Sequence, residues 1–214
     1  MSVQKIFSTL TIKEAIESRR SIRKFIQETI QDEEIKEILN LVRLTPSAWN
    51  IQPWHFHIIK DIQLKEKLQK AAYGQTQVTS APAVVIISVD MVDSINRISE
   101  TIHPGISEDK KQIEVSNLTS LFEKMSEEER KAWGQTQANI ALGFLLLTIQ
   151  GFGYTSVPML GFDQEKVRTL LGLPEHVTFA AMVPFGKPDT DGYEHHRFEL
   201  DKISTFYSEK EQVI

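Results

Sequence analysis

The stretch TPSAWNIQPWHF, residues 45–56, carries two of the three tryptophans and two of the eight prolines of a 214-residue chain. Upstream of it, apolar residues recur at helical spacing between residues 32 and 44, which predicts a helix that Pro46 stops. Downstream, Trp54, Phe56 and Ile58 alternate with histidines, which predicts a half-buried strand. Two tryptophans beside prolines and uncharged polar groups are costly in a solvated loop. The composition therefore indicates a loop with a binding role.

Capping patterns predict the starts of two helices. Residues 11–14 (TIKE) and 126–129 (SEEE) both have the Thr/Ser-x-x-Glu spacing of a capping box, so each is expected to start a helix. The first helix ends near Ser18. The second runs to Ile149 and is apolar nearly all round in its second half, so we expect it to be buried on several sides and to be ended by Gly151.

The remaining patterns mix strands and helices. The apolar run PAVVIISV, residues 82–89, is typical of a strand that is covered on both faces. We also expect a helix from Asp61, a strand at 154–157, a helix at 163–171 closed by Gly172, and a strand at 177–185. Because these elements do not alternate as regular βαβ units, the sequence predicts one α+β domain over residues 1–214.

The composition narrows the class of protein. With 41% hydrophobic and 25% charged residues the chain is an ordinary globular protein, and its net charge of −5 predicts no nucleic-acid partner. The absence of cysteine excludes disulfides, thiolate catalysis and cysteine metal sites. The start MSVQKIFSTL lacks the pattern of a signal peptide, and the run at 140–149 is about half the ~20 residues that span a bilayer. We therefore expect a cytoplasmic protein with no membrane partner.

The first stretch that could carry chemistry is SRRSIRKF, residues 18–25. It places three arginines, a lysine and two serines together in an acidic protein. Guanidinium groups and a serine hydroxyl are suited to binding a phosphate. Alternatively, the cations complement the dipole at the end of the first helix and face water. Taken alone, the stretch favours this second interpretation.

Two further stretches could contact a ligand. In residues 45–56, Asn50 and Gln52 have amides that match the donor–acceptor edge of a planar heterocycle; the alternative is that these amides serve turns. Trp49 and Trp54 are expected in the core. In GYTSVPMLGF, residues 153–162, Gly161 allows close approach to the backbone; the alternative is a plain strand-to-helix turn.

The histidines give no catalytic or metal pattern. His195 and His196 are neighbours in a polar tail, where a solvated segment is the favoured interpretation and no metal site is expected. The sequence has no nucleophile elbow, no P-loop and no G-x-G-x-x-G motif. The chemistry is therefore expected to belong to an organic cofactor.

Taken together and in order, these stretches resemble the nitroreductase family of FMN-dependent NAD(P)H oxidoreductases. RRSIRKF resembles the family's Arg-x-Ser-x-Lys/Arg motif, and PSAWNIQPWHF resembles its Pro-Ser-x-x-Asn-x-Gln-Pro-Trp motif. GFGYTSVPMLGFD resembles its glycine–proline loop, and FAAMVPFGKP followed by Arg197 resembles its closing strand and tail. The similarity runs from about Ile12 to Leu200. It implies a nitroreductase-like α+β fold with a central, mostly antiparallel sheet flanked by helices, and an interlocked homodimer whose tail, residues 187–214, extends onto the partner.

The resemblance also implies roles for individual residues. The FMN phosphate and ribityl chain would be held by Arg19, Arg20 and Ser21, with Arg197 closing from the tail. Arg23 would lie at the N1–C2 edge of the flavin and stabilise the charge of its reduced form. The partner subunit would contribute Pro46, Ser47, Asn50 and Gln52. The flavin ring would lie along Pro158, Met159, Leu160 and Gly161, with a backbone N–H near N5.

The implied activity is hydride transfer from NADH or NADPH to FMN and on to a small-molecule acceptor, a nitro compound or a quinone, with ping-pong kinetics. Alternatives on the same fold are dehalogenation, azoline oxidation, flavin breakdown, or flavin binding without turnover. The chain departs from the family pattern at Leu160, where some members have glutamate, and at His195, near a frequent lysine. Residues 90–125 are expected to form a variable helical lid.

Overall fold

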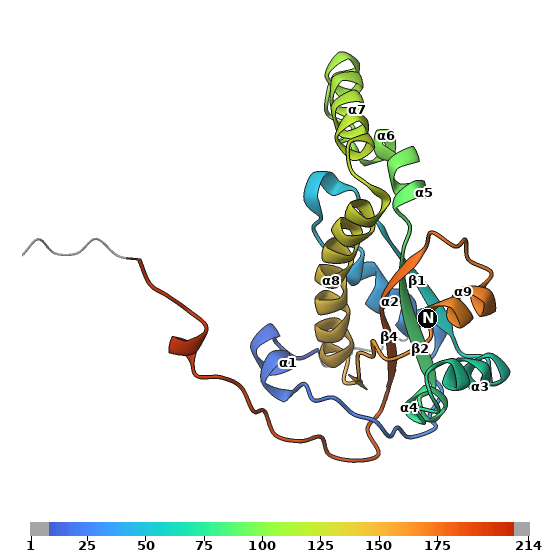
Figure 1. Ribbon diagram of the computed structural model, residues 1–214. Coiled ribbons are helices and arrows are strands. Elements are labelled where there is room, and N and C mark those ends of the chain that lie inside the picture. Colours follow the sequence, from blue (N-terminus) through green and yellow to red (C-terminus); the bar gives the residue numbers. More distant parts are fainter. Residues whose placement is uncertain (1–8, 208–214) are drawn as a thin grey trace, which may run out of the picture.

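The computed structural model describes residues 9–207 (Figure 1). The expectation about a signal peptide concerns residues 1–8 and therefore lies outside the described residues, as do tail residues 208–214. Four strands form one sheet in the order β1-β2-β4-β3, and every neighbouring pair is antiparallel. Their bounds are β1 Trp54–Ile59, β2 Ala83–Val89, β3 Thr155–Ser156 and β4 Thr178–Gly186.

Both faces of the sheet are covered, because residues of one strand alternate between two hydrophobic clusters. In β2, Val85 and Ile87 belong to the cluster beneath helices α2 (Asp32–Val42) and α8 (Glu127–Gly151), whereas Val84 and Ile86 belong to the cluster beneath α3 (Ile62–Ala71) and α9 (Gln164–Leu171). All seven residues of β2 are buried, as the continuous apolar run predicts. The strand begins at Ala83 rather than at the expected Pro82, which has no N–H to donate to the ladder.

The helices have the following bounds: α1 Ile12–Ser18, α2 Asp32–Val42, α3 Ile62–Ala71, α4 Gln77–Ser80, α5 Met91–Asn96, α6 Ile98–Thr101, α7 Glu108–Glu123, α8 Glu127–Gly151 and α9 Gln164–Leu171. Short 3-10 turns occur at Ala48–Asn50 and Leu200–Lys202. The capping boxes at Thr11 and Ser126 are both formed, and Gly172 closes α9 in the left-handed conformation. These helix boundaries are confirmed.

Three predicted features are wrong in detail. Helix α2 ends at Val42 rather than Leu44, because Leu44 and Thr45 tighten into turn hydrogen bonds ahead of Pro46. Gly151 is the last residue of α8 and not its terminator; the left-handed residue is Gly153, with φ of 79°. The strand expected at residues 154–157 is limited to Thr155–Ser156. The second half of α8, by contrast, is buried on several sides as expected, with Phe144 left 42% exposed.

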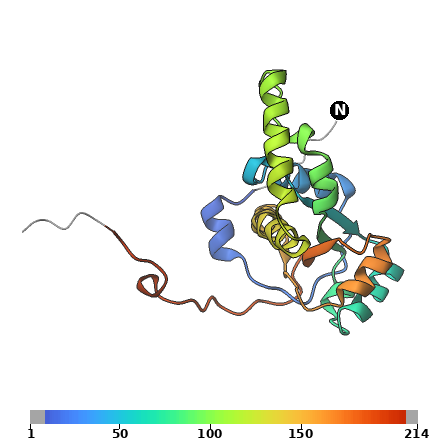
Figure 2. The ribbon, with the colours of Figure 1, turned by 45° about the horizontal axis from the view of Figure 1, so that its top comes forward.

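Two segments leave the sheet. Helices α5, α6 and α7 form the expected helical excursion, and α7 projects beyond the end of the sheet (Figure 1). Residues 187–195 run beside the extended segment after α1, and the rest of the described tail, coloured red, leaves the body of the molecule in both views (Figure 2). The apolar side chains of this tail are exposed in the described chain: Tyr193, Phe198, Leu200, Ile203, Phe206 and Tyr207.

Candidate functional site

The arginine stretch lies beside the glycine–proline loop. After α1 ends at Ser18, the backbone becomes extended, and Ser21 forms a parallel bridge with Ser156 of β3. The Ile22 N–H donates to the Ser156 carbonyl at 3.3 Å. Two of the motifs singled out in the sequence, separated by more than a hundred residues, therefore meet at one edge of the sheet.

Arg19 has a guanidinium that is half-buried and incompletely paired. Its Nη1 is fully buried and has no hydrogen-bond partner among residues 9–207. Burial lowers the pKa of Arg19 below its ordinary value, and the charges of Arg197 and Arg20 lower it further. A buried donor without a partner costs about 1–3 kcal/mol. Arg19, Arg20 and Arg197 therefore form a cation cluster, which a bound anion would stabilise.

The tail closes over this cluster. Arg20 pairs with Glu194 at 3.1 Å, and its Nη1 lies 2.7 Å from His195 Nε2. Because arginine can only donate, His195 accepts through Nε2, and its neutral ring then carries the proton on Nδ1. At Gly192 a Cβ would come within 2.4 Å of the Arg20 Cβ, so the tail approaches more closely there than any other residue type permits. His195 is exposed, as a solvated tail predicts, but it also contacts Arg20.

The glycine–proline loop is held at both ends. Met159 exchanges backbone hydrogen bonds with Met182 of β4 at 2.8 and 3.0 Å. Gln75 donates from Nε2 to the Gly161 carbonyl at 2.7 Å, which ties the loop to the turn after α3. Pro158 is partly buried, whereas Leu160 is 73% exposed and Gly161 is open to solvent.

Gln75 was missed in the sequence. The sequence signal for a role of Gln75 is weak. Gly74, which has φ of 78°, adopts the left-handed conformation in the turn after α3, and Gln75 follows it. A polar side chain after such a turn gives no indication that it reaches a loop 86 residues further on.

The loop at residues 46–52 has a strained backbone. Trp49, Asn50 and Gln52 have φ of 52°, 57° and 49°, a region that residues with a Cβ seldom adopt. Ser47 accepts from the Gln52 N–H at 3.0 Å, and Gln52 donates to Asn50 Oδ1 at 2.9 Å. The Asn50 amide also donates to the Thr101 carbonyl of α6 at 3.0 Å, so the loop is held both by its own hydrogen bonds and by a neighbouring helix. Pro46 is exposed at the start of the loop.

The expectation that both tryptophans are core residues is correct for Trp54 and wrong for Trp49. Trp54 packs against the main hydrophobic cluster. Trp49 is 50% exposed, because the left-handed backbone turns its side chain outward. Spacing and residue type do not encode this backbone conformation.

One chain does not bring all the expected residues together. The Ala48 N–H donates to Gln137 of α8, whereas Ser18, next to Arg19, accepts from Gln150 of the same helix. Gln137 and Gln150 are 13 residues apart in α8, which is about 20 Å along a helix axis. Within one chain, the 46–52 loop therefore contacts the middle of α8, whereas the arginine cluster lies at its C-terminal end.

Arg23 and Arg197 are exposed. Arg197 donates to the His196 carbonyl at 2.8 Å. In the part of the chain that the structure describes, Arg23 has neither a hydrogen bond nor an ion pair through its side chain. It lies one residue beyond the bonded pair Ile22–Ser156, at the rim of the same edge.

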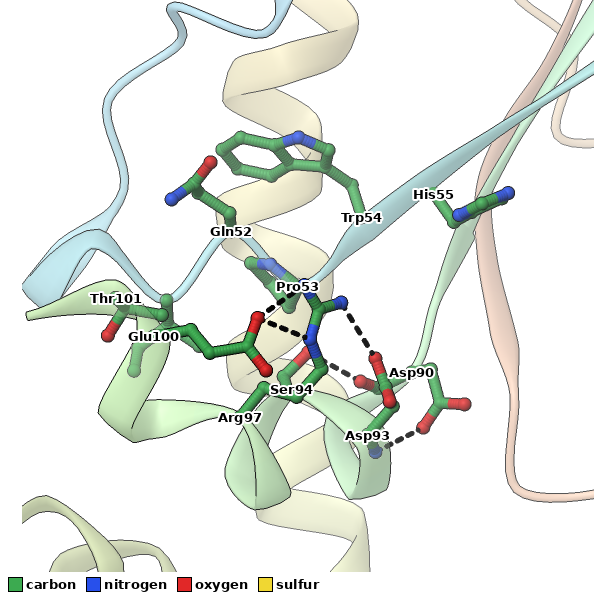
Figure 3. A pocket seen from close by; sticks show the side chains of 11 residues that line it. Gln52, Pro53, Trp54, His55, Asp90, Asp93, Ser94, Arg97, Glu100 and Thr101 are labelled. Carbon is green, nitrogen blue, oxygen red and sulfur yellow. Dashed lines mark hydrogen bonds and ion pairs between the residues drawn. The ribbon is translucent and has the colours of Figure 1, made fainter. Parts of the chain in front are cut away.

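A cavity of about 310 Å³ lies between residues 51–55 and the helices α5 and α6 (Figure 3). Figure 3 shows Arg97 at its centre, with ion pairs to Asp93 at 3.3 Å and to Glu100 at 3.0 Å. Asp90 caps α5 and pairs with His176 at 3.0 Å. Of the expected cofactor residues, only Gln52 lines this cavity. Arg97, the cation of this cavity, is already paired with two carboxylates, so the cavity does not resemble an anion site.

Two other classes of site are not found among residues 9–207. No group of three or more histidine or carboxylate side chains is placed to hold a metal ion. Nor does any described helix combine the length and apolar composition required to cross a bilayer.

The comparisons with known proteins agree with this fold. The sequence model of the Nitroreductase family matches residues 16–187 of this chain. A Thermus thermophilus protein named NADH dehydrogenase is 40% identical over 194 residues, which cover 91% of this chain and 95% of that protein. The chain therefore belongs to the nitroreductase family.

Solved structures give the same result for the fold. The structure of a nitroreductase family protein from Streptococcus pneumoniae superposes with a TM-score of 0.83 at 24% identity, covering 92% of this chain and 100% of that one. A structure from Exiguobacterium sibiricum, solved in complex with FMN, has a TM-score of 0.85 at 23% identity and covers 94% and 99% of the two chains. The nitroreductase-like α+β fold predicted from the four motifs is confirmed.

Proposed function

We propose that the protein is an FMN-dependent oxidoreductase that takes hydride from NADH or NADPH and reduces nitro compounds or quinones. The observation that carries the proposal is the buried, unpartnered Arg19 Nη1 inside a cluster of three arginines. A bound anion would give Arg19 Nη1 the partner that it lacks and would offset the repulsion from the neighbouring arginines. The name of the Thermus thermophilus relative and the FMN in a structure of the same fold support a flavin phosphate as that anion.

The residues present fit FMN. Arg19, Arg20, Ser21 and Arg197 would hold the phosphate and ribityl chain. The exposed Gly161 and Leu160 would lie along the ring, on a loop held by β4 and Gln75. Bound FMN would supply the hydride-accepting and hydride-donating chemistry. The exposed, unpartnered Arg23 would add a positive charge at the rim, which favours the reduced flavin.

We further propose that two copies of the chain form the complete site. The 46–52 loop lies about 20 Å along α8 from the arginine cluster, so Pro46, Ser47, Asn50 and Gln52 reach a flavin only from a partner subunit. An apolar groove of about 410 Å³ on α1, α2 and α8 is exposed in the single chain. Its lining includes Leu10, Ile12, Leu41, Phe144 and Leu147. A surface of this kind is expected to be covered by a second copy.

The redox proposal is tested by adding NADH, and separately NADPH, to the FMN-loaded protein under anaerobic conditions. Rapid loss of the oxidised-flavin absorbance with either donor supports an oxidoreductase. Subsequent addition of a quinone or a nitro compound should restore the absorbance, as a ping-pong mechanism requires. Unchanged absorbance with both donors would refute the redox proposal and favour a flavin-binding protein without turnover.

The shared site is tested by complementation. Asn50→Ala and Arg19→Ala subunits should each bind FMN poorly as homodimers. When they are mixed under conditions that exchange subunits, the heterodimer has one site with both changes and one site with neither. FMN binding should therefore recover at up to half of the heterodimer sites. No recovery, or a sedimenting monomer that binds one FMN, would contradict the shared site.

A further inference from the structure

A groove of about 510 Å³ lies between helices α3 and α9, which pack against each other (Figure 1). The charged residues that line it are Lys67, Lys70, Lys166 and Glu165. Three cations and one anion make the groove locally positive, although the chain as a whole has a net charge of −5. We call it the lysine groove.

The helix dipoles do not explain these lysines. Lys70 is in the last turn of α3, where a cation complements the dipole, but Lys166 is in the first turn of α9, where a cation is disfavoured. Lys166 is held there by Asp163, whose carboxylate lies 2.8 Å from the ammonium group. In the described part of the chain, the side chains of Lys67 and Lys70 have neither a hydrogen bond nor an ion pair. The groove therefore has two cations that are free to bind an anion, and a third next to them.

The lysine groove is adjacent to the loop that would lie along the flavin ring. The Asp163 N–H donates to the carbonyl of Ala71, which lines the groove, at 2.9 Å. Gly161 precedes Asp163 by two residues, and its carbonyl accepts from Gln75 at 2.7 Å. Lys166 is three residues beyond Asp163, which is about 4.5 Å along a helix axis. A ligand that covers the ring at Gly161 can therefore extend into the groove.

Tyr73 lies in the turn that joins Ala71, in the groove, to Gln75, at the loop. Its side chain is 72% exposed, and its backbone has φ of 55°, which is disfavoured for an aromatic residue. Such conformations persist where the surroundings impose them, and they gather at binding sites. The pKa of Lys166 is raised mainly by Asp163 and to a lesser extent by Tyr73, so the tyrosine is close enough to interact with this cation. The turn thus places an aromatic stacking surface beside the groove.

We propose that the lysine groove binds the 2′-phosphate on the adenosine ribose of NADPH, and that the protein therefore prefers NADPH to NADH as its donor. A phosphate monoester carries more than one negative charge at neutral pH, and lysine ammonium groups bind phosphate as point charges. Lys70 and Lys166 would contact the phosphate, and the adenine would pass over Tyr73. This inference rests on the proposed function and adds to it the choice of donor and the residues that make it.

Two alternatives lead to different results. The adenosine of NADH has free ribose hydroxyls, which would donate to Glu165. The groove has one carboxylate and three lysines, so its charge balance favours the phosphate. The other alternative is a face of solvated lysines, which would bind neither nucleotide selectively.

The test measures the binding of NADP⁺ and NAD⁺ to the oxidised, FMN-loaded protein by isothermal titration calorimetry. Both nucleotides are in the oxidised form, so binding is read without electron transfer. Lys70→Gln and Lys166→Gln each remove one cation of the groove, and Glu165→Gln removes its carboxylate. Lys110→Gln on α7 is the matched control, because Lys110 is also an exposed helical lysine but does not line the groove.

Wild type should bind NADP⁺ about tenfold more tightly than NAD⁺, which corresponds to about 1.4 kcal/mol. Lys70→Gln and Lys166→Gln should each weaken NADP⁺ binding about threefold and leave NAD⁺ binding unchanged, and the double variant should lose the preference. Lys110→Gln should change neither affinity. Adenosine 2′,5′-bisphosphate should compete with NADP⁺, whereas inorganic phosphate at the same concentration should not. A merely structural role of the lysines would change both nucleotide affinities alike.

Equal affinities for NADP⁺ and NAD⁺ in wild type would overturn the proposal, as would a preference that persists in the double variant. Tighter binding of NAD⁺ that is lost in Glu165→Gln would also overturn it, by assigning the groove to the ribose hydroxyls of NADH. Equal competition by inorganic phosphate would reduce the groove to an unselective anion site and overturn it as well. Failure of the proposed function is a separate outcome: it is read from the FMN titration and from the absence of flavin bleaching by NADH and NADPH, whereas nucleotide binding is measured without a donor.

Discussion

Replacing Arg19 by methionine should stabilise the FMN-free protein and weaken FMN binding in the same variant. The guanidinium is half-buried with an unpartnered Nη1, and its pKa is lowered chiefly by burial. Removing a buried, unsatisfied donor is worth about 1–3 kcal/mol, and partial exposure places the gain near 1 kcal/mol. For a chain of this size, that gain corresponds to a rise of about 2–4 °C in melting temperature.

The effect on FMN binding has the opposite sign. Loss of a charge-assisted hydrogen bond costs about 1.5–3 kcal/mol, which is a roughly 10- to 150-fold weaker affinity. At an FMN concentration of 100 times the wild-type Kd, binding stabilises the wild-type protein by about 2.7 kcal/mol and the variant by about 0.3–1.4 kcal/mol. The variant should therefore melt above wild type without FMN and below it, or level with it, with FMN.

The assay is thermal unfolding of both proteins with and without FMN, together with a fluorescence titration of FMN. Lys67→Met on α3 is the matched control, because it removes an exposed cation far from the cluster in sequence. The control should not change the order of melting temperatures. A variant that is less stable than wild type without FMN, and that binds FMN as tightly, would refute the assignment of Arg19 to an anion site.

Three further changes test separate features. Arg23→Gln should lower the flavin reduction potential in a spectroelectrochemical titration, where ~30 mV corresponds to ~1.4 kcal/mol; an unchanged potential would remove Arg23 from the flavin edge. Burial, with a smaller effect of His55, lowers the pKa of His57 to about 4, so the unfolded chain binds more protons between pH 6.5 and 4. Stability should fall as the pH falls through this window, with a slope below about 1.4 kcal/mol per pH unit because the ring is only half-buried, and His57→Gln should flatten that slope in denaturant unfolding. Gly134→Ala should destabilise the protein by about 1–3 kcal/mol, since the new Cβ would lie 2.7 Å from Val89 and Met91 side-chain atoms; a more stable variant would show that helix propensity outweighs this contact.

Features set by local interactions could be predicted from the sequence. Capping at Thr11 and Ser126 depends on residues three positions apart, so each helix start is determined by a few neighbouring residues. The strand β2 was predictable because a run buried on both faces has no polar positions. Helix ends were less predictable, because the left-handed residue that ends a helix can shift along the chain, as from Gly151 to Gly153.

Features set by distant contacts could not be predicted. The sequence places Arg19, Arg20 and Arg23 together. It does not show that the Arg19 side chain is turned inward and that its Nη1 is left without a partner. This burial depends on Ser156 meeting Ser21 and on the tail passing over Arg20. The contact between Gln75 and Gly161 is equally non-local. Family resemblance, which reflects the complete fold, predicts a phosphate site at the cluster, whereas local patterns favoured a solvated helix end.

The arrangement along α8 has a consequence for how the protein would work. If the arginine cluster of one subunit holds the flavin phosphate and the 46–52 loop of the other approaches the flavin, each site depends on the C-terminal end of one α8 and on the middle of the other. Trp133, which stacks on Trp49, and Gln137, which holds Ala48, are both in the first half of α8. A single rigid helix of 25 residues would then fix the distance between one subunit's contributions to the two sites. Association would complete both cofactor sites together, so a separated subunit should bind FMN far more weakly than the dimer.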